Sequence, residues 1–208
     1  MKRPGKIVCV GRNYLAHAAE LGNQIPEAPL FFFKPTSAVI GPGEAIRLPS
    51  YSKQVEHEAE IGVIIGRSIR NVDEADAEAA IAGIICVNDV TARDIQRTED
   101  QWVRAKGFDT WCPLGEAPVS LDASPPWQDL EVICRVNGEV RQHGYARDMA
   151  FGIPFLVSQI SRIMTLEVGD LISTGTPAGV GPLRPGDTVE VEIPGVGTLS
   201  NPVVASDA

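Results

Sequence analysis

The stretch from Val55 to Ile65 constrains the fold of this chain most strongly, because acidic and apolar side chains alternate along its first half. Alternation with a period of two indicates a β-strand whose successive side chains point to opposite faces. Glu56, Glu58 and Glu60 share one face, and the run then continues almost wholly apolar to Gly66. A strand that carries carboxylates into a core needs a group that compensates their charge.

Two interpretations account for these glutamates when they are considered alone. A hard divalent cation binds carboxylate oxygens, and the i, i+2 spacing lets Glu58 and Glu60 converge on it. An edge strand with its glutamates in water is the more common situation for an isolated Glu-x-Glu pattern. Asp89 follows the apolar strand Ile84–Val87 at a position where sheets commonly bind ligands, although a turn aspartate also fits there.

Composition favours one mixed, mainly β domain over residues 1–208. The chain has 208 residues, 44% of them hydrophobic, and its 20 glycines and 16 prolines predict many turns. A net charge of -9 without a basic stripe argues against a nucleic-acid partner. No apolar run is long enough for a membrane span, and no signal peptide precedes the first strand. Four widely spaced cysteines predict reduced thiols and a cytoplasmic protein.

Several local signals predict individual elements. A short helix is expected from Asn13 to Leu21, ended by Gly22, and a second from Asp73 to Ala80. Asn137-Gly138 predicts a type I′ hairpin, and Ile153–Ile163 predicts an amphipathic helix with Pro154 near its first position. Thr91 and Asp94 have the spacing of a capping box before another helical segment.

Six segments of the chain, taken together, resemble the fumarylacetoacetate hydrolase family. They occur in the order found in that family and extend over most of the chain, from about Lys6 to Val204. The segments are Gly11-Arg12-Asn13-Tyr14 with His17 and Glu20, Phe33-Lys34-Pro35, His57-Glu58-Ala59-Glu60-Ile61-Gly62, Asn88-Asp89-Val90-Thr91-Ala92-Arg93-Asp94-Ile95-Gln96, Ala105-Lys106-Gly107-Phe108-Asp109, and Thr174-Gly175-Thr176-Pro177.

The resemblance implies a β-roll-like catalytic fold, a homodimer and a metal site. It assigns Glu58, Glu60 and Asp89 as ligands of Mg²⁺ or Mn²⁺, which share a preference for oxygen ligands. The metal would bind the carboxylate and keto oxygens of a small 2-oxo acid. Longer members of the family carry an additional N-terminal domain, whereas this chain is expected to form a single catalytic domain.

The resemblance also implies roles for residues around the metal. His17 and Glu20 lie at i, i+3 on the expected first helix, where a glutamate can orient a histidine as general base, although a surface pair has the same spacing. Lys106 would contact an oxyanion or carboxylate of the substrate. Gln96, Thr176, Lys34 and Arg93 are further candidates for substrate binding, and Arg93 is equally suited to a structural ion pair. His57 lies on the strand face opposite Glu58 and is left out, and His143 is expected at the surface.

These assignments predict a metal-dependent hydrolase that cleaves the C–C bond of a 2,4-dioxo acid, such as an acylpyruvate or fumarylpyruvate. The products would be pyruvate and a carboxylic acid, with His17 activating the attacking water. Two alternatives remain on the same metal site: decarboxylation of oxaloacetate, or isomerisation of an unsaturated 2-oxo diacid. A non-catalytic module that binds oxo acids is a third interpretation, against which the complete set of candidate residues argues.

Overall fold

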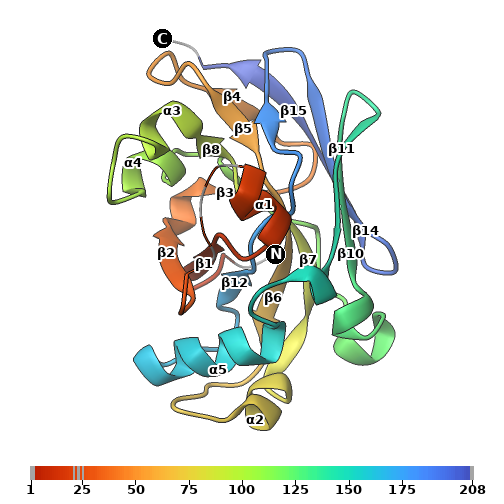
Figure 1. Ribbon diagram of the computed structural model, residues 1–208. Helices are drawn as coiled ribbons and strands as arrows, with labels where there is room; N and C mark the ends of the chain where they lie inside the picture. The colour runs from red at the N-terminus through yellow and green to blue at the C-terminus, as the bar shows by residue number, and fades with distance from the viewer. Residues whose placement is uncertain (1–2, 21, 23, 25, 207–208) are drawn as a thin grey trace.

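The computed structural model describes residues 3–20, 22, 24 and 26–206 of the chain. Within these residues, two five-stranded sheets form the body of the molecule, and two smaller sheets and several short helices lie around them (Figure 1). The mixed, mainly β architecture expected from the sequence is confirmed.

The first large sheet carries the strands that lead to the acidic residues. Its order is β2-β1-β12-β6-β7, and its strands are β1 (Ile7–Gly11), β2 (Leu30–Lys34), β6 (Ala59–Ile65), β7 (Ile81–Asn88) and β12 (Leu171–Ser173). β1 and β12 run parallel, and the other neighbours are antiparallel. β6 is buried along its whole length, which explains its nearly continuous apolar sequence.

The second large sheet packs against β6 and β7 and closes the core. Its order is β11-β10-β14-β15-β4, and its strands are β4 (Ile46–Leu48), β10 (Glu131–Val136), β11 (Glu139–Tyr145), β14 (Thr188–Ile193) and β15 (Gly197–Ala205). Alternate residues of β10 and β14 are buried, as expected for strands with one face on a core. Asn137 and Gly138 both have positive φ, so the predicted type I′ hairpin between β10 and β11 is confirmed.

The expected single strand from Val55 to Ile65 is wrong, because the chain changes sheet at Glu58. Residues Val55–His57 form β5, which pairs with β13 (Gly181–Pro182) and β8 (Thr91–Ala92) in a three-stranded sheet. β6 begins at Ala59 in the first large sheet. The remaining small sheet pairs β3 (Val39–Ile40) with β9 (Cys112–Pro113).

The helices are short apart from one, and they lie outside the sheets. They are α1 (Leu15–Glu20), α2 (Glu74–Glu78), α3 (Arg93–Gln96), α4 (Val103–Lys106) and α5 (Ile153–Ile163), with 3₁₀ turns at Thr36–Ala38, Leu121–Ala123, Trp127–Asp129 and Ala146–Asp148. α5 has the predicted bounds, and Pro154 lies in its first turn. α1 begins two residues later than expected, and the expected end at Leu21 lies outside the described residues.

The predicted capping box at Thr91 and Asp94 is wrong. Ala92 occupies the N-cap position of α3 and makes no side-chain cap. The Thr91 hydroxyl donates to the backbone carbonyl of Asp89 at 2.8 Å, and the Asp94 carboxylate accepts from Ser52 Oγ and the backbone N–H of Lys53. Both side chains therefore hold neighbouring loops in place.

The prediction of reduced thiols is confirmed, because all four cysteines are free and buried. Among the residues that the structure describes, no helix is long and apolar enough to cross a membrane.

Candidate metal and active site

Three buried carboxylates converge where the chain passes from β5 to β6 and where β7 ends. Glu58 lies between the two strands, Glu60 is the second residue of β6, and Asp89 directly follows β7. The Glu58 N–H donates to Asn88 Oδ1 at 3.0 Å, and the Asp89 N–H donates to the Glu58 carbonyl at 2.8 Å. One oxygen from each carboxylate lies within 4.8 Å of the other two. The change of sheet thus brings together the three residues that the resemblance selected as ligands.

The ammonium group of Lys106 lies among these carboxylates. Its Nζ donates to Glu58 Oε2 at 2.7 Å and to Asp89 Oδ2 at 2.6 Å. Asp89 Oδ1 forms an ion pair with Lys34 Nζ at 2.7 Å but accepts no hydrogen bond from the described residues. A buried set of only carboxylate oxygens, one of them without a donor, fits a hard cation such as Mg²⁺ or Mn²⁺. Because the Lys106 ammonium already contacts two of these carboxylates, we expect it to move when a cation binds.

Charge balance within this buried cluster depends on Glu60. The cluster contains the four carboxylates of Glu56, Glu58, Glu60 and Asp89. It also contains three cations, which belong to Lys34, Arg93 and Lys106. Burial, with the carboxylates of Asp89 and Glu58, raises the pKa of Glu60 to about 8. Its Oε2 accepts from Ser173 Oγ and the Gly175 N–H. One proton on Glu60 therefore neutralises the metal-free cluster at neutral pH.

Glu58 differs from Glu60 because two cations contact it directly. Burial raises its pKa, but Lys106 and Arg93 outweigh burial and hold the pKa of Glu58 well below its usual range. Arg93 donates from Nη2 to Glu58 Oε1 at 2.5 Å and from Nε to Glu56 Oε2 at 2.7 Å. Arg93 also binds the side-chain oxygen of Gln96. The structural ion pair considered for Arg93 is therefore present, and Gln96 is held beside it.

His17 and Glu20 form the pair expected on α1. His17 Nδ1 lies 3.3 Å from Glu20 Oε2, and Glu20 also accepts from the backbone N–H of Gly179. Burial lowers the pKa of His17, so its imidazole is neutral near neutral pH. With Nδ1–H donated to Glu20, Nε2 carries the lone pair. The pair can therefore accept a proton from a bound molecule.

Gln142 holds the loop around Thr176 against the start of β6, a role that no local pattern around Gln142 indicates. Its side-chain oxygen accepts from the Ala59 N–H at 3.0 Å and lies 2.8 Å from His57 Nδ1. Its amide nitrogen donates to Thr176 Oγ1 and to the Pro177 carbonyl. The Thr176 hydroxyl donates to the Ala59 carbonyl, so its hydrogen-bonding capacity is used within the protein.

A cavity of about 690 Å³ opens onto this site. Most of the candidate site residues line this cavity: Glu58, Glu60, Lys106, Arg93, Gln96, His17, Glu20 and Thr176. Asp89 and Lys34 lie behind its wall. Lys34 is buried, and its ammonium also donates to the Val90 carbonyl at 3.1 Å. Its contacts orient Asp89. His57 lines a second, separate hollow, and His143 is exposed beside Glu131, as expected for a surface residue.

Comparison with known proteins identifies related sequences and structures. The sequence profile described as "Fumarylacetoacetate (FAA) hydrolase C-terminal" matches residues 6–204. The chain is 42% identical to "Oxaloacetate decarboxylase, mitochondrial" of Dictyostelium discoideum, over 93% of this chain and 90% of that protein. It is also 42% identical to "Oxaloacetate tautomerase YisK" of Bacillus subtilis, over 97% of this chain and 70% of that protein.

One solved structure has a similar fold. It is described as 5-carboxymethyl-2-hydroxymuconate delta-isomerase from Mycobacterium smegmatis. The two chains are 46% identical and superpose with a TM-score of 0.91, over 99% of this chain and 81% of the other. The names of these three proteins describe decarboxylation, tautomerisation and isomerisation of small oxo or hydroxy acids.

Proposed function

Because the chain belongs to the fumarylacetoacetate hydrolase family, with a match over residues 6–204, we propose that it is a metal-dependent isomerase of a small 2-oxo diacid. The proposed reaction is keto–enol isomerisation of an oxaloacetate-type acid, in which a proton leaves carbon 3 and another is added at the 2-oxo oxygen. The relatives named for oxaloacetate and muconate reactions support this proposal over C–C hydrolysis.

One observation carries the proposal: a neutral histidine and the carboxylate cluster face the same cavity. Removing a proton beside a keto group requires a base near the carbon and positive charge near the oxygen. His17 would supply the base, and the carboxylates of Glu58, Glu60 and Asp89 would hold the divalent cation that supplies the positive charge. His17 on α1 and Glu58 at the junction of β5 and β6 both line this cavity, which supports the proposed division of roles.

The roles of the residues follow from their contacts. A divalent cation held by Glu58, Glu60 and Asp89 would act as a Lewis acid toward the substrate's carboxylate and keto oxygens. His17 Nε2 accepts the proton from carbon 3, while Glu20 holds the imidazole through Nδ1. The electron pair of the broken C–H bond moves to form the C2–C3 double bond, and negative charge develops on the keto oxygen. Lys106, once withdrawn from the carboxylates, and Gln96 would bind that oxygen or the adjacent carboxylate.

Two further residues act by positioning in this proposal. Lys34 holds Asp89 from behind the cavity wall, and Arg93 holds Glu58 and Gln96. Thr176 can offer its backbone N–H to the substrate carboxylate, since its hydroxyl already bonds Ala59 and Gln142.

Hydrolysis of an acylpyruvate is the second candidate, and the His17–Glu20 pair is the observation that favours it. A neutral, oriented imidazole suits the activation of water as well as the removal of a carbon-bound proton. In hydrolysis, the activated water attacks the distal carbonyl, and cleavage of the C3–C4 bond places the electron pair on the pyruvate fragment. A proton then adds to carbon 3.

The experiment that tests the function is a panel of oxaloacetate, fumarylpyruvate and an acylpyruvate, assayed with Mg²⁺, with Mn²⁺ and with chelator. We expect metal-dependent interconversion of enol and keto oxaloacetate, followed by the ultraviolet absorbance of the enol. Pyruvate release is measured in parallel to detect decarboxylation or cleavage. Efficient acylpyruvate cleavage without oxaloacetate isomerisation would favour the hydrolase, and no conversion of any acid would favour a binding module.

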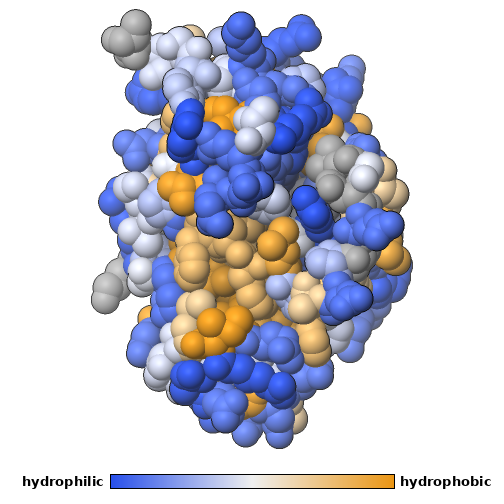
Figure 2. All heavy atoms as spheres, turned by 60° about the vertical axis from the view of Figure 1, so that its left-hand side comes forward, coloured by the Kyte–Doolittle hydropathy of each residue, from blue (hydrophilic) through white to orange (hydrophobic). Residues whose placement is uncertain are grey.

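We also propose that the protein is a homodimer that uses the face around β2. β2 lies at the edge of the first sheet, Phe33 is 48% exposed, and Val103 on the adjoining α4 is 68% exposed. Figure 2, which brings this side forward, shows a hydrophobic area between more hydrophilic regions. Sedimentation of the 22.3 kDa chain should give about twice that mass, and Phe33→Glu should shift it toward monomer. A monomeric unmodified protein at micromolar concentration would contradict the proposal.

A further inference from the structure

Arg12 differs from the three buried cations of the site because no carboxylate of the described residues neutralises it. Lys34, Arg93 and Lys106 are each paired with buried carboxylates. Arg12 lines the same cavity, and in the part of the chain that the structure describes, its guanidinium has no ion pair. Its recorded contact is with the Trp102 ring, whose centroid lies 6.0 Å from Arg12 Cζ. A bound anion therefore meets an uncommitted cation at this position.

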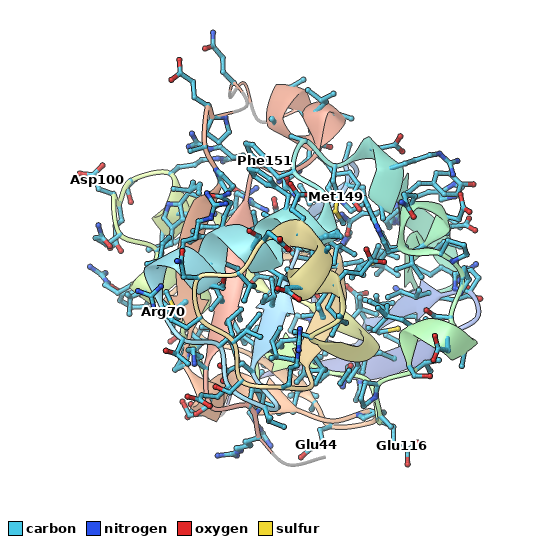
Figure 3. All side chains as sticks on the ribbon, turned by 90° about the horizontal axis from the view of Figure 1, so that it is seen from below. Glu44, Arg70, Asp100, Glu116, Met149 and Phe151 are labelled. Carbon is cyan, nitrogen blue, oxygen red and sulfur yellow. The ribbon has the colours of Figure 1, made fainter. Side chains whose placement is uncertain are left out.

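The fold holds the backbone of Arg12 in an unfavourable conformation. Arg12 lies in the turn between β1 and α1 with φ of 57°, a region that a residue with a side chain seldom adopts. Such a conformation persists where the surroundings fix it. The next residue, Asn13, is fully buried and bonds the Thr174 carbonyl and both backbone groups of Phe151, which is labelled in Figure 3. These bonds fix the turn and thus the point from which the Arg12 side chain starts.

An aromatic wall connects Arg12 with the carboxylate cluster. Lys106 Nζ lies 5.0 Å from the centroid of the Phe32 ring, and Phe32 packs edge-on against Trp102 at 5.2 Å. Trp102 in turn lies beside Arg12 and against Gly11, where an added Cβ would lie 2.8 Å from the Trp102 ring. The cavity therefore has a cation-binding cluster at one end of this wall and a free guanidinium at the other. This arrangement suits a short acid with a carboxylate at each end.

The other charged groups at the mouth of the cavity are less suited to this role. Arg97 donates to the side-chain oxygen of Gln54 and is exposed. Glu99 is paired with Arg104. Figure 3 shows Asp100 on the loop between α3 and α4, directed away from the body of the molecule. Arg12 is therefore the cation best placed to receive a second carboxylate.

We propose that Arg12 binds the distal carboxylate of the substrate and so selects 2-oxo diacids over 2-oxo monoacids. The inference rests on the proposed function, because it specifies the substrate class of the same site. A guanidinium binds a carboxylate through two parallel hydrogen bonds, and the Trp102 ring beside it limits its freedom. An acid with an apolar distal end leaves Arg12 without a partner.

Equilibrium binding of two probes of equal chain length tests the proposal without relying on turnover. Metal-loaded protein is titrated calorimetrically with 2-oxoglutarate and with 2-oxopentanoate, which differ only in the distal carboxylate. We expect Arg12→Met to weaken binding of 2-oxoglutarate by about 10- to 100-fold and to leave that of 2-oxopentanoate within about twofold. Arg12→Lys should recover part of the lost affinity, since lysine keeps the positive charge but lacks the two parallel N–H donors of the guanidinium.

Two matched variants and a folding control complete the test. Arg97→Met removes an exposed arginine that also lines the cavity, and Arg104→Met removes one outside it. Thermal unfolding of each variant checks that the fold is retained. Equal weakening of both probes by Arg12→Met, selective weakening by Arg97→Met instead, or equal affinity of the unmodified protein for both probes would overturn the proposal. Failure of the proposed function is distinguishable, because diacid-selective binding would then persist without isomerisation of oxaloacetate.

Discussion

Replacing Glu58 by glutamine should destabilise the metal-free protein at pH 7 by about 3–5 kcal/mol, whereas replacing Glu60 by glutamine should leave it at least as stable as the unmodified protein. Glu58 neutralises two buried cations, Arg93 and Lys106, through contacts of 2.5 and 2.7 Å. Removing one partner of a buried pair leaves an uncompensated charge, which accounts for a loss of this size. For a chain of this length, the loss lowers the melting temperature by about 10 °C.

Glu60 responds differently because its carboxyl group is already neutral in the metal-free protein at pH 7. With a pKa of about 8, it carries a proton, and a glutamine side chain has nearly the same shape and charge. The amide oxygen of glutamine can still accept from Ser173 Oγ and the Gly175 N–H. Glu60→Gln therefore keeps the folded-state contacts, and it removes the cost of protonating a carboxylate that is ionised in the unfolded chain at pH 7.

The pKa of Glu60 determines how the stability of the metal-free protein and its affinity for metal depend on pH. The folded-state pKa of Glu60 lies above the ordinary glutamate value of 4.5, so its contribution to stability is complete below pH 4.5 and is lost as the pH rises through 8. A metal ion needs the ionised carboxylate, so its apparent affinity should fall about tenfold for each pH unit below 8. Glu60→Gln should abolish both dependences, and both variants should weaken metal binding by at least about 100-fold.

Thermal unfolding and calorimetric titration with Mn²⁺, each from pH 5 to 9, measure these effects. Glu78→Gln, on the exposed face of α2, is the matched control and should change neither quantity. Equal destabilisation by Glu58→Gln and Glu60→Gln would contradict the assigned charge states. Unchanged metal affinity in both variants would place the metal elsewhere.

His17→Ala should lower kcat by about 10²- to 10⁴-fold while leaving metal affinity unchanged. The imidazole is the base in both candidate reactions, and it makes no contact with Glu58, Glu60 or Asp89 that the structure records. Burial lowers the pKa of His17, so kcat at saturating metal should decline only as the pH falls below about 6.5, the ordinary value for histidine. This acidic limb should disappear in His17→Ala.

The companion substitution Glu20→Gln separates orientation from proton transfer. It removes the charge beside the imidazole but keeps a group that can bond Nδ1 and the Gly179 N–H, so a smaller decrease in kcat is expected. A rate for His17→Ala within threefold of the unmodified protein, with an unchanged pH profile, would show that another group is the base.

Local sequence patterns predicted those elements whose shape depends on neighbouring residues. Asn137-Gly138 defines its turn because both residues tolerate positive φ, and α5 has the bounds that Pro154 and its apolar spacing indicate. The prediction of a capping box at Thr91 and Asp94 was wrong because both side chains form other hydrogen bonds. Asp94 bonds Ser52, which is distant in sequence, and Thr91 bonds the backbone carbonyl of Asp89, which lies before the helix. The prediction of a single domain over residues 1–208 stays a prediction.

The glutamate pattern with which the sequence analysis began indicated buried charge, and the order of six motifs indicated the family and a candidate ligand set. Only the tertiary structure showed that the strand breaks at Glu58, because the bonds to Asn88 and Asp89 that cause the break come from β7 and the residue after it. Only the tertiary structure also showed the contacts of Gln142 and the unequal charge states of Glu58 and Glu60. Residue type and spacing along the chain determine which groups are available, whereas pKa values and pairing depend on distances across the fold, which no local pattern contains.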